Sequence, residues 1–203
     1  DRAQMAVDRD AHLTGSSPAY VNEHRVQCKN GEWKWVLSRG MVVARNHDGQ
    51  PLRMIGTHTD ISGRKRAETL IWQQANFDAL TGLPNRRMLR QQLDVSLLRA
   101  AQDGRPVAVA FIDLDHFKEV NDTLGHDFGD MLLVQAAQRI RQATGSNDTV
   151  ARMGGDEFTV VVSDIAAGDH LGDQLSQRLA ALLDALSQGF ELRGQTVFVS
   201  ASI

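Results

Sequence analysis

Two groups of carboxylates in this chain of 203 residues have the positions expected of a cation site. One group, Asp113-Leu114-Asp115, directly follows the apolar run from Val107 to Ile112, which is typical of a strand buried on both faces. The other lies in Gly154-Gly155-Asp156-Glu157, where a Gly-Gly pair between strand-like runs predicts a hairpin turn with positive φ at both glycines. Carboxylates at a strand end and on a neighbouring hairpin can converge on one cation.

The second half of the chain contains the elements that must position these carboxylates. Apolar residues recur at helical spacing in three segments, and the hairpin strands lie between the second and the third. Because helices alternate with strands, we expect α/β layers with a mixed sheet. The expected helices cover 86–101, 129–144 and 170–187, and the expected hairpin strands cover 149–151 and 158–162.

The first third of the chain has a period of two instead. Three strand-like runs, 20–28, 33–44 and 52–59, are separated by the turns Asn30-Gly31 and Asp48-Gly49 and predict an antiparallel meander. A short helix is expected before it, over 5–13, and a longer helix after it, over 64–77.

Composition excludes several classes of protein. A formal net charge of −3 gives no general attraction to a nucleic acid polymer, so the partner is expected to be a small, metal-neutralised anion. A single cysteine, Cys28, excludes an internal disulfide and fits a reducing compartment. No apolar run approaches the ~20 residues that span a bilayer. We therefore expect a cytoplasmic segment. Because the chain begins without methionine and ends in a strand-like run, we expect a piece of a longer protein, whose remaining part has room for a membrane anchor.

Five motifs in order resemble the GGDEF domain of diguanylate cyclases, which condense two GTP molecules into cyclic di-GMP. The resemblance implies a nucleotidyl-cyclase palm-like fold with a sheet flanked by helices, working as a homodimer because each half-site holds one GTP. The motifs are Asp78–Arg87, Phe111–Lys118, Asn121–His126, Gly129-Asp130 and Arg152–Phe158.

The resemblance implies a metal site for Mg²⁺ or Mn²⁺. Asp113 and Asp156 match the side-chain ligands, and Leu114 matches a position that offers its backbone carbonyl. Glu157 matches a second acidic position that either activates the attacking hydroxyl or binds metal. Asp113, Asp156 and Glu157 are thus the expected catalytic residues.

Substrate contacts are implied in the same way. Asn121 and Asp130 match positions that read guanine, although Asp130 after Gly129 could equally be a helix N-cap. Phe117 and Lys118 match a turn whose amides and lysine approach the phosphates. Gly154 and Gly155 are also expected to bind the substrate.

Two departures from the family pattern affect the expected activity. Members often have an Arg-x-x-Asp product-inhibition site, but here Gly145 occupies the arginine position, while Asp148 is retained. We therefore expect weak or absent feedback inhibition. The chain also stops at a strand-like run that resembles the strand before the family's final segment, so later phosphate-binding cations are absent and this segment alone is expected to have little activity.

Residues 20–65 resemble the C-terminal half of a PAS sensor domain and its exit motif. We therefore expect a partial PAS domain at 1–62, a linker or signalling helix at 63–77 and a truncated GGDEF domain at 78–203. Trp33 and Trp35 are expected to be core residues and His24 a surface or packing residue, and no haem, flavin or metal is predicted there.

Two other functions remain open from the residues. The GGDEF domain could bind GTP only to regulate an adjoining cyclic di-GMP phosphodiesterase. More distantly, the site could belong to a cyclase that makes a cyclic mononucleotide.

Overall fold

The computed structural model describes residues 1–163, 165–168 and 170–203. It divides into two compact units, Asp1–Trp72 and Gln73–Ile203, which are considered separately. Helix α2 (Ser62–Asn76) carries the chain from the first unit into the second. No helix of the described residues is long and apolar enough to cross a bilayer.

The first unit is the expected antiparallel meander. Its sheet has the strand order β1-β2-β3, and helix α1 (Arg2–Leu13) packs against β1. Of the two places expected for His24, surface or packing, the structure shows the second: His24 is buried, and its Nδ1 lies 2.9 Å from Oδ1 of Asn22. Trp33 was expected in the core but is 63% exposed at the start of β2. The strands are β1 (Tyr20–Gln27), β2 (Trp33–Arg45) and β3 (Pro51–Asp60).

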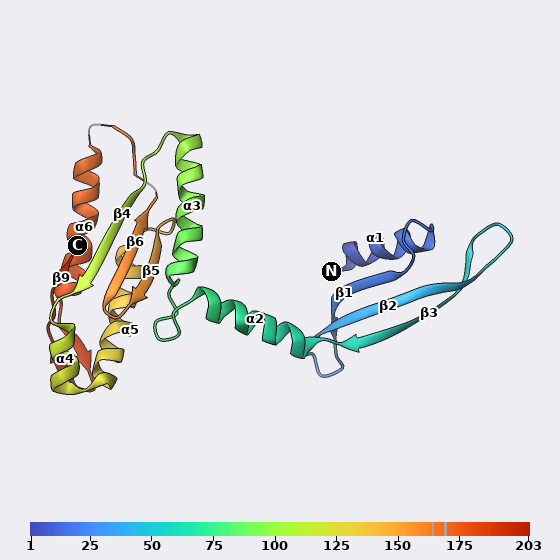
Figure 1. Cartoon of the computed structure of the whole chain (residues 1–203), viewed down its shortest axis with the longest axis horizontal. Coiled ribbons are helices and arrows are strands. Elements are labelled where there is room, and N and C mark those ends of the chain that lie inside the picture. Colours follow the sequence, from blue (N-terminus) through green and yellow to red (C-terminus); the bar gives the residue numbers. More distant parts are fainter. Residues whose placement is uncertain (164, 169) are drawn as a thin grey trace. The chain divides into compact units, whose positions relative to one another are not determined.

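The second unit is an α/β structure built around a four-stranded sheet (Figure 1). Each helix and hairpin strand expected from the periodicity is present, with bounds shifted by a few residues. A short helix, α4, and a small hairpin, β7–β8, were not expected. The elements are α3 (Arg86–Asp103), β4 (Ala108–Leu114), α4 (Phe117–Leu124), α5 (His126–Ala143), β5 (Thr149–Gly154), β6 (Glu157–Val162), α6 (Leu171–Ser187), β7 (Phe190–Leu192), β8 (Gln195–Val197) and β9 (Ala201–Ser202).

The strand order of this sheet is β5-β6-β4-β9, and each of its pairings between described strands is antiparallel. A mixed sheet was expected, because helices that alternate with strands favour parallel pairing and the hairpin adds an antiparallel pair. Strands β4 and β5 do run in the same direction. They are not neighbours, however. The hairpin returns β6 between them, so each pairs only with an antiparallel strand.

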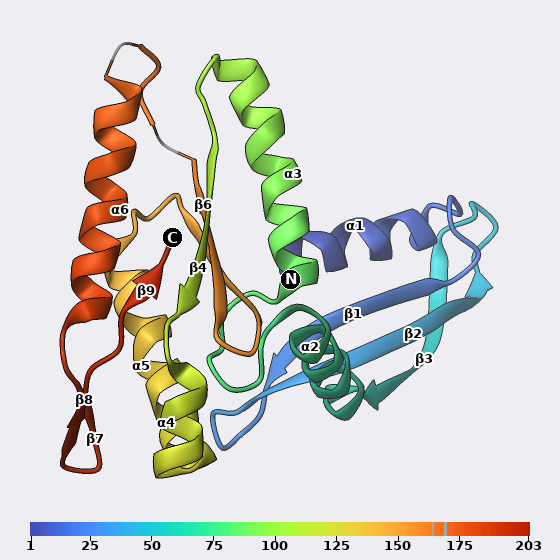
Figure 2. The ribbon, with the colours of Figure 1, turned by 60° about the vertical axis from the view of Figure 1, so that its left-hand side comes forward.

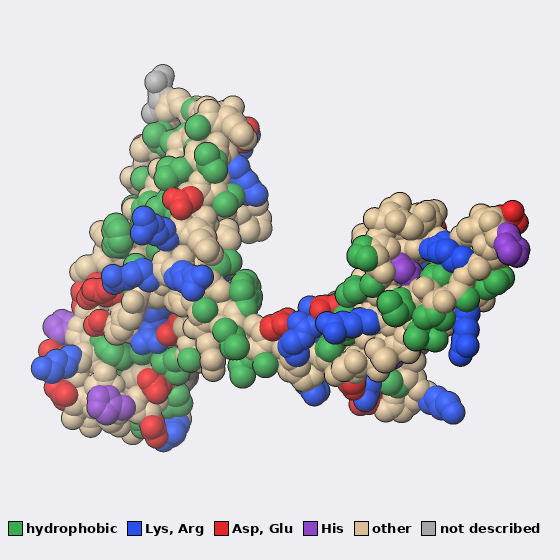
Figure 3. Space-filling model, turned by 45° about the vertical axis from the view of Figure 1, so that its right-hand side comes forward, with side chains coloured by type: hydrophobic (Ala, Val, Ile, Leu, Met, Phe, Trp, Pro, Cys, Tyr) green, Lys and Arg blue, Asp and Glu red, His purple; other side chains and the backbone are tan. Residues whose placement is uncertain are grey.

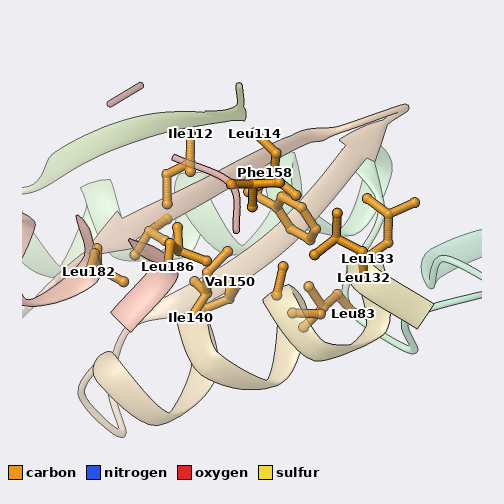
Figure 4. Close-up of a cluster of buried hydrophobic side chains, with 14 of the residues drawn as sticks. Leu83, Ile112, Leu114, Leu132, Leu133, Ile140, Val150, Phe158, Leu182 and Leu186 are labelled. Carbon is orange, nitrogen blue, oxygen red and sulfur yellow. The ribbon is translucent and has the colours of Figure 1, made fainter. Parts of the chain in front are cut away.

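The two faces of the sheet are covered by different helices (Figure 2). Helices α5 and α6 enclose the main core on one face, where Phe158 is fully buried (Figure 4). Helix α3 packs on the other face, where Leu89 meets Ala151 and Val161. The remaining core residues labelled in Figure 4 are Leu83, Ile112, Leu114, Leu132, Leu133, Ile140, Val150, Leu182 and Leu186.

Strand β4 is buried on only one face, contrary to the expectation. Its residues alternate between the core and the surface, and Val109 and Phe111 are 40% and 69% exposed. The physical reason is that α3 packs against β5 on that side of the sheet and does not extend over β4. On the face of the molecule that Figure 3 shows, acidic and basic side chains are interspersed, which fits the small net charge.

Candidate active site

The end of β4 lies beside the hairpin that carries the second acidic pair. Asp113 is the register partner of Glu157 in β6 and of Ser202 in β9. The next amide along β4, that of Leu114, donates to the carbonyl of Asp156 at 3.4 Å. The antiparallel register therefore brings together Asp113, Asp156 and Glu157, which the sequence had placed in separate motifs.

The electrostatics at this point favour a bound cation. The pKa of Asp113 is raised above its ordinary value, first by partial removal of the carboxylate from water and then by the negative charges of Asp156, Glu157 and Asp115. Among the described residues, the structure shows no side chain that donates a hydrogen bond to, or forms an ion pair with, Asp113, Asp156 or Glu157. A positive charge placed among them would relieve this repulsion.

The turn of the hairpin lies one residue later than expected. Gly154 still pairs with Glu157, so the two central residues are Gly155 and Asp156. The φ angles of Gly154 and Gly155 are 135° and 56°, which explains why both positions favour glycine. Asp156 has no positive φ, so the turn is not the expected one with both glycines at its centre.

Arg152 holds this turn in place. Its Nε and Nη2 donate to the carbonyl of Gly155 at 3.0 and 2.7 Å, and its Nη1 lies 3.0 and 3.1 Å from the two carboxylate oxygens of Asp78. Asp78 also accepts from the amide and the hydroxyl of Thr81. Both residues lie in the motifs named above, but neither was predicted to position the site. In the sequence, the one indication that these two residues pair is that they carry opposite charges.

Asp115 anchors the strand on the other side of β4. Its carboxylate accepts hydrogen bonds from the hydroxyls of Ser200 and Ser202, at 2.6 and 2.8 Å, and its amide donates to the carbonyl of Ser200 at 3.0 Å. These bonds lower the pKa of Asp115, with the bond from Ser200 the largest cause. Asp115 thus fixes β9 beside Asp113, a role that the sequence did not indicate.

The predicted guanine-reading residues lie on two helices that pack together. Asn121 is on α4 and Asp130 is on α5, and α4 contacts α5. Asp130 is not a helix N-cap, because α5 begins earlier, after the cap residue Gly125. Asp130 is exposed and Asn121 is half-buried, so neither side chain is closed off from solvent.

Phe117 and Lys118 form the first turn of α4 instead of a separate turn. The reversal after β4 falls at His116, whose φ is 62°. Phe117 packs against the main core, whereas Lys118 is exposed. The amides of Phe117 and Lys118 belong to the helix start, where backbone donors have no acceptor within the helix.

The carboxylate arrangement fits a metal that takes few protein ligands. The described residues contain no group of three or more His, Cys, Asp or Glu side chains placed to hold a metal by themselves. Mg²⁺ is usually bound through one or two carboxylates, with phosphates and water completing its six oxygen ligands. The unpaired Asp113 and Asp156 carboxylates meet this requirement, and they are hard oxygen donors of the right type.

A family model described as "Diguanylate cyclase, GGDEF domain" matches residues 75–203. The chain belongs to the GGDEF family. A second family model, for the PAS fold, matches residues 1–58, so the GGDEF domain follows a PAS-type segment.

Curated relatives of this GGDEF chain come from bacteria. The chain is 41% identical over 140 residues to MucR of Pseudomonas aeruginosa, named a bifunctional diguanylate cyclase/cyclic di-GMP phosphodiesterase, covering 68% of this chain and 19% of MucR. It is 48% identical over 95 residues to the diguanylate cyclase TpbB of the same species, covering 47% of this chain and 22% of TpbB. The chain therefore spans less than a third of the length of the curated relatives it matches.

Solved structures support the GGDEF fold. The GGDEF domain of TpbB from Pseudomonas aeruginosa has a TM-score of 0.58 at 39% identity, covering 62% of this chain and 71% of that one. A sensory box/GGDEF family protein of Caulobacter crescentus has a TM-score of 0.58 at 40% identity, covering 63% and 80% of the respective chains.

Asp148, which was predicted to be the retained aspartate of a degenerate inhibition site, is held by contacts within the protein. The side chain of Asp148 is 2% exposed, and its carboxylate accepts from the amides of Gly145 and Ser163 at 2.8 and 3.1 Å. It also lies 3.4 Å from Nη1 of Arg178 on α6. This carboxylate is therefore already occupied within the protein.

Proposed function

We propose that the second unit is one half-site of a diguanylate cyclase, which condenses two GTP molecules into cyclic di-GMP and two pyrophosphates. The observation that carries this proposal is the gathering of Asp113, Asp156 and Glu157 where β4 meets the hairpin, with the pKa of Asp113 raised by its acidic neighbours. Family membership supports it, since a relative such as TpbB is named a diguanylate cyclase.

In this reaction the 3′-hydroxyl of each GTP attacks the α-phosphorus of the other. One P–O bond forms and the bond to pyrophosphate breaks, and this happens twice per product. Such transfers depend mainly on positioning and on neutralising phosphate charge. Mg²⁺ or Mn²⁺ would supply that neutralisation and polarise the phosphate.

The protein's own residues have separable roles in this proposal. Asp113 and Asp156 hold the metal, together with the carbonyl of Leu114, and Glu157 either takes the hydroxyl proton or adds a metal contact. Lys118 and the first amides of α4 face the phosphates. Gly154 and Gly155 allow the turn to approach the nucleotide, because no side chain projects from them.

Asn121 and Asp130 would read the base. A carboxylate accepts two N–H bonds from the guanine edge, whereas adenine would face that carboxylate with a lone pair. Leaving a buried polar group without a partner costs ~1–3 kcal/mol, which corresponds to roughly tenfold discrimination or better.

We further propose that two copies of the chain act together, because one half-site holds one GTP and the product has two-fold symmetry. Residues 1–62 would form the PAS sensor part, 63–77 the signalling helix and 78–203 the GGDEF domain. Control of the cyclase by the PAS segment, and a cytoplasmic location, are part of this proposal.

A regulatory role is the second candidate. It is favoured by relatives such as NbdA of Pseudomonas aeruginosa, named a cyclic di-GMP phosphodiesterase, to which the chain is 41% identical over 137 residues. In that case GTP bound at this site would control an adjoining phosphodiesterase without being converted.

The test is to incubate the full-length protein with GTP and Mg²⁺ and to separate the nucleotides by chromatography. Cyclic di-GMP formed by the wild type and by Asp184→Ala, an exposed control on α6, but not by Asp156→Ala, would support the proposal. GTP binding without product at any protein concentration would point to the regulatory role. A cyclic mononucleotide would refute both.

A further inference from the structure

Helix α5 carries a glycine, Gly129, beside the side chain of Asn121 on α4. A Cβ atom placed on Gly129 would overlap Oδ1 of Asn121 and would lie 2.9 Å from its Cγ. Side-chain carbons do not approach other heavy atoms this closely. Asn121 can therefore keep its position against α5 only because residue 129 has no side chain.

The backbone gives no other reason for this glycine. Gly129 lies inside α5, it is buried, and it is not among the glycines with positive φ. Alanine would fit its helical conformation and would favour the helix. The three heavy atoms nearest to such a methyl group all belong to the Asn121 carboxamide, which therefore excludes it.

We propose that Gly129 is a positioning residue that sets the base specificity of the site. Gly129 leaves room for the carboxamide of Asn121, so that this group stays against α5. Asp130 directly follows Gly129 in α5. The amide and the carboxylate can then contact one base together. This inference rests on the proposed function, because it assumes that Asn121 and Asp130 bind guanine.

The geometry separates this role from a purely structural one. The atoms that a Cβ would meet belong to the end of a side chain, which can rotate away without unfolding the helices. Gly129→Ala should therefore fold and retain its thermal stability, while the carboxamide is displaced from its place beside Asp130.

The experiment measures the affinity of the full-length protein for a GTP analogue with a methylene group between its α- and β-phosphorus atoms, which cannot be cyclised. Gly129→Ala should bind it about tenfold more weakly, the loss expected when one polar contact to the base is removed. The preference over the matching ATP analogue should fall as well, and the KM for GTP should rise more than kcat falls. The matched control is Gly172→Ala on α6, where a Cβ would meet no atom within 4 Å.

A double variant decides whether the effect passes through Asn121. Asn121→Ala removes the three atoms nearest to a Cβ at position 129, so adding Gly129→Ala to it should cause no further loss of affinity. The inference is overturned if Gly129→Ala binds as tightly as the wild type, or if its loss is equally large without Asn121. If the wild type itself does not bind the GTP analogue, both the proposed function and this inference are refuted.

Discussion

Arg152 and Asp78 form a two-point ion pair, with Nη1 of the arginine 3.0 and 3.1 Å from the two oxygens of the carboxylate. Asp78 lies in the connection between α2 and α3, and Arg152 lies in β5. The amide of Arg152 also donates to the carbonyl of Pro84 in the same connection, at 3.0 Å. One residue thus ties this connection to the turn that carries Asp156.

Arg152→Ala should destabilise the second unit and lower kcat. The side chains of Arg152 and Asp78 are only 11% and 22% exposed, so the unpaired carboxylate would be left largely out of water. We expect a loss of about 2–4 kcal/mol in the free energy of unfolding, measured by urea titration. Arg99→Ala, an exposed arginine on α3, is the control. Unchanged stability and kcat in Arg152→Ala would contradict this role for the ion pair.

Acid should weaken the same contact. Burial acts to raise the pKa of Asp78, but the hydrogen bonds from Thr81 and Arg152 outweigh it and lower the pKa below the ordinary 3.8. A carboxylate with a lowered folded-state pKa contributes stability above its unfolded pKa and loses it as pH falls through the folded value. The stability difference between the wild type and Asp78→Asn, measured by thermal unfolding, should therefore be constant near pH 7 and shrink below about pH 4. A difference independent of pH would show that the charge is not involved.

Asp156→Asn should remove activity and yet raise the thermal stability of the metal-free protein. The pKa of Asp113 is raised in the fold, which means that folding disfavours its ionised form. The contribution of Asp113 to stability is therefore most favourable below the ordinary pKa, and it is lost as pH rises through the raised pKa. Removing one neighbouring charge lessens this penalty at neutral pH. A metal site contributes several kcal/mol to the reaction, so we expect kcat to fall by at least ~100-fold.

The measurement is the melting temperature with EDTA and with Mg²⁺. The wild type should gain stability from Mg²⁺, and Asp156→Asn should gain little. As pH is lowered, protons compete with Mg²⁺ for the Asp113 carboxylate. Because the pKa of Asp113 is raised, the stability that the wild type gains from Mg²⁺ should decline at a higher pH than it would with an aspartate of ordinary pKa. A lower melting temperature for Asp156→Asn in EDTA would argue against repulsion at this site.

Asp148→Ala should damage the fold without changing product inhibition. The buried carboxylate bonds to two backbone amides and lies beside Arg178, so its removal should cost about 2–3 kcal/mol of unfolding free energy. Calorimetric titration of the wild type with cyclic di-GMP should show weak or no binding here. Tight binding that Asp148→Ala abolishes, while the variant remains folded, would show that the inhibition site functions without its arginine.

Arg139→Ala should loosen the end of α6. The Arg139 guanidinium donates to the carbonyls of Ala185, Gln188 and Gly189, at 3.0, 2.6 and 2.6 Å, and lies 3.7 Å from the ring centroid of Phe190. A cation at a helix C-terminus satisfies carbonyls that have no donor within the helix. We expect a loss of about 2–3 kcal/mol in urea unfolding, with Arg99→Ala again as the control. Equal stability of the two variants would mean that water replaces the guanidinium without loss.

The sequence by itself determined the local elements and the identities of the chemical groups. Helical spacing of Leu89 and Leu93 marked α3, alternation marked the meander of the first unit, and the acidic motifs pointed to a metal site. These signals are local, because periodicity and turn residues act within a few positions of the chain. They also placed β4 wrongly as a strand buried on both faces, since an apolar run does not say which of its faces a helix will cover.

The tertiary structure alone decided which distant groups meet. Asp78 and Arg152 pair across 74 positions, and Asp115 binds serines more than 80 positions away. Asn121 packs on Gly129 because two helices cross there, and β6 lies between β4 and β5. Periodicity does not predict such pairings, because they depend on how whole elements pack to bury their apolar faces. Only that packing brings the charges of Asp113 and Asp156 together.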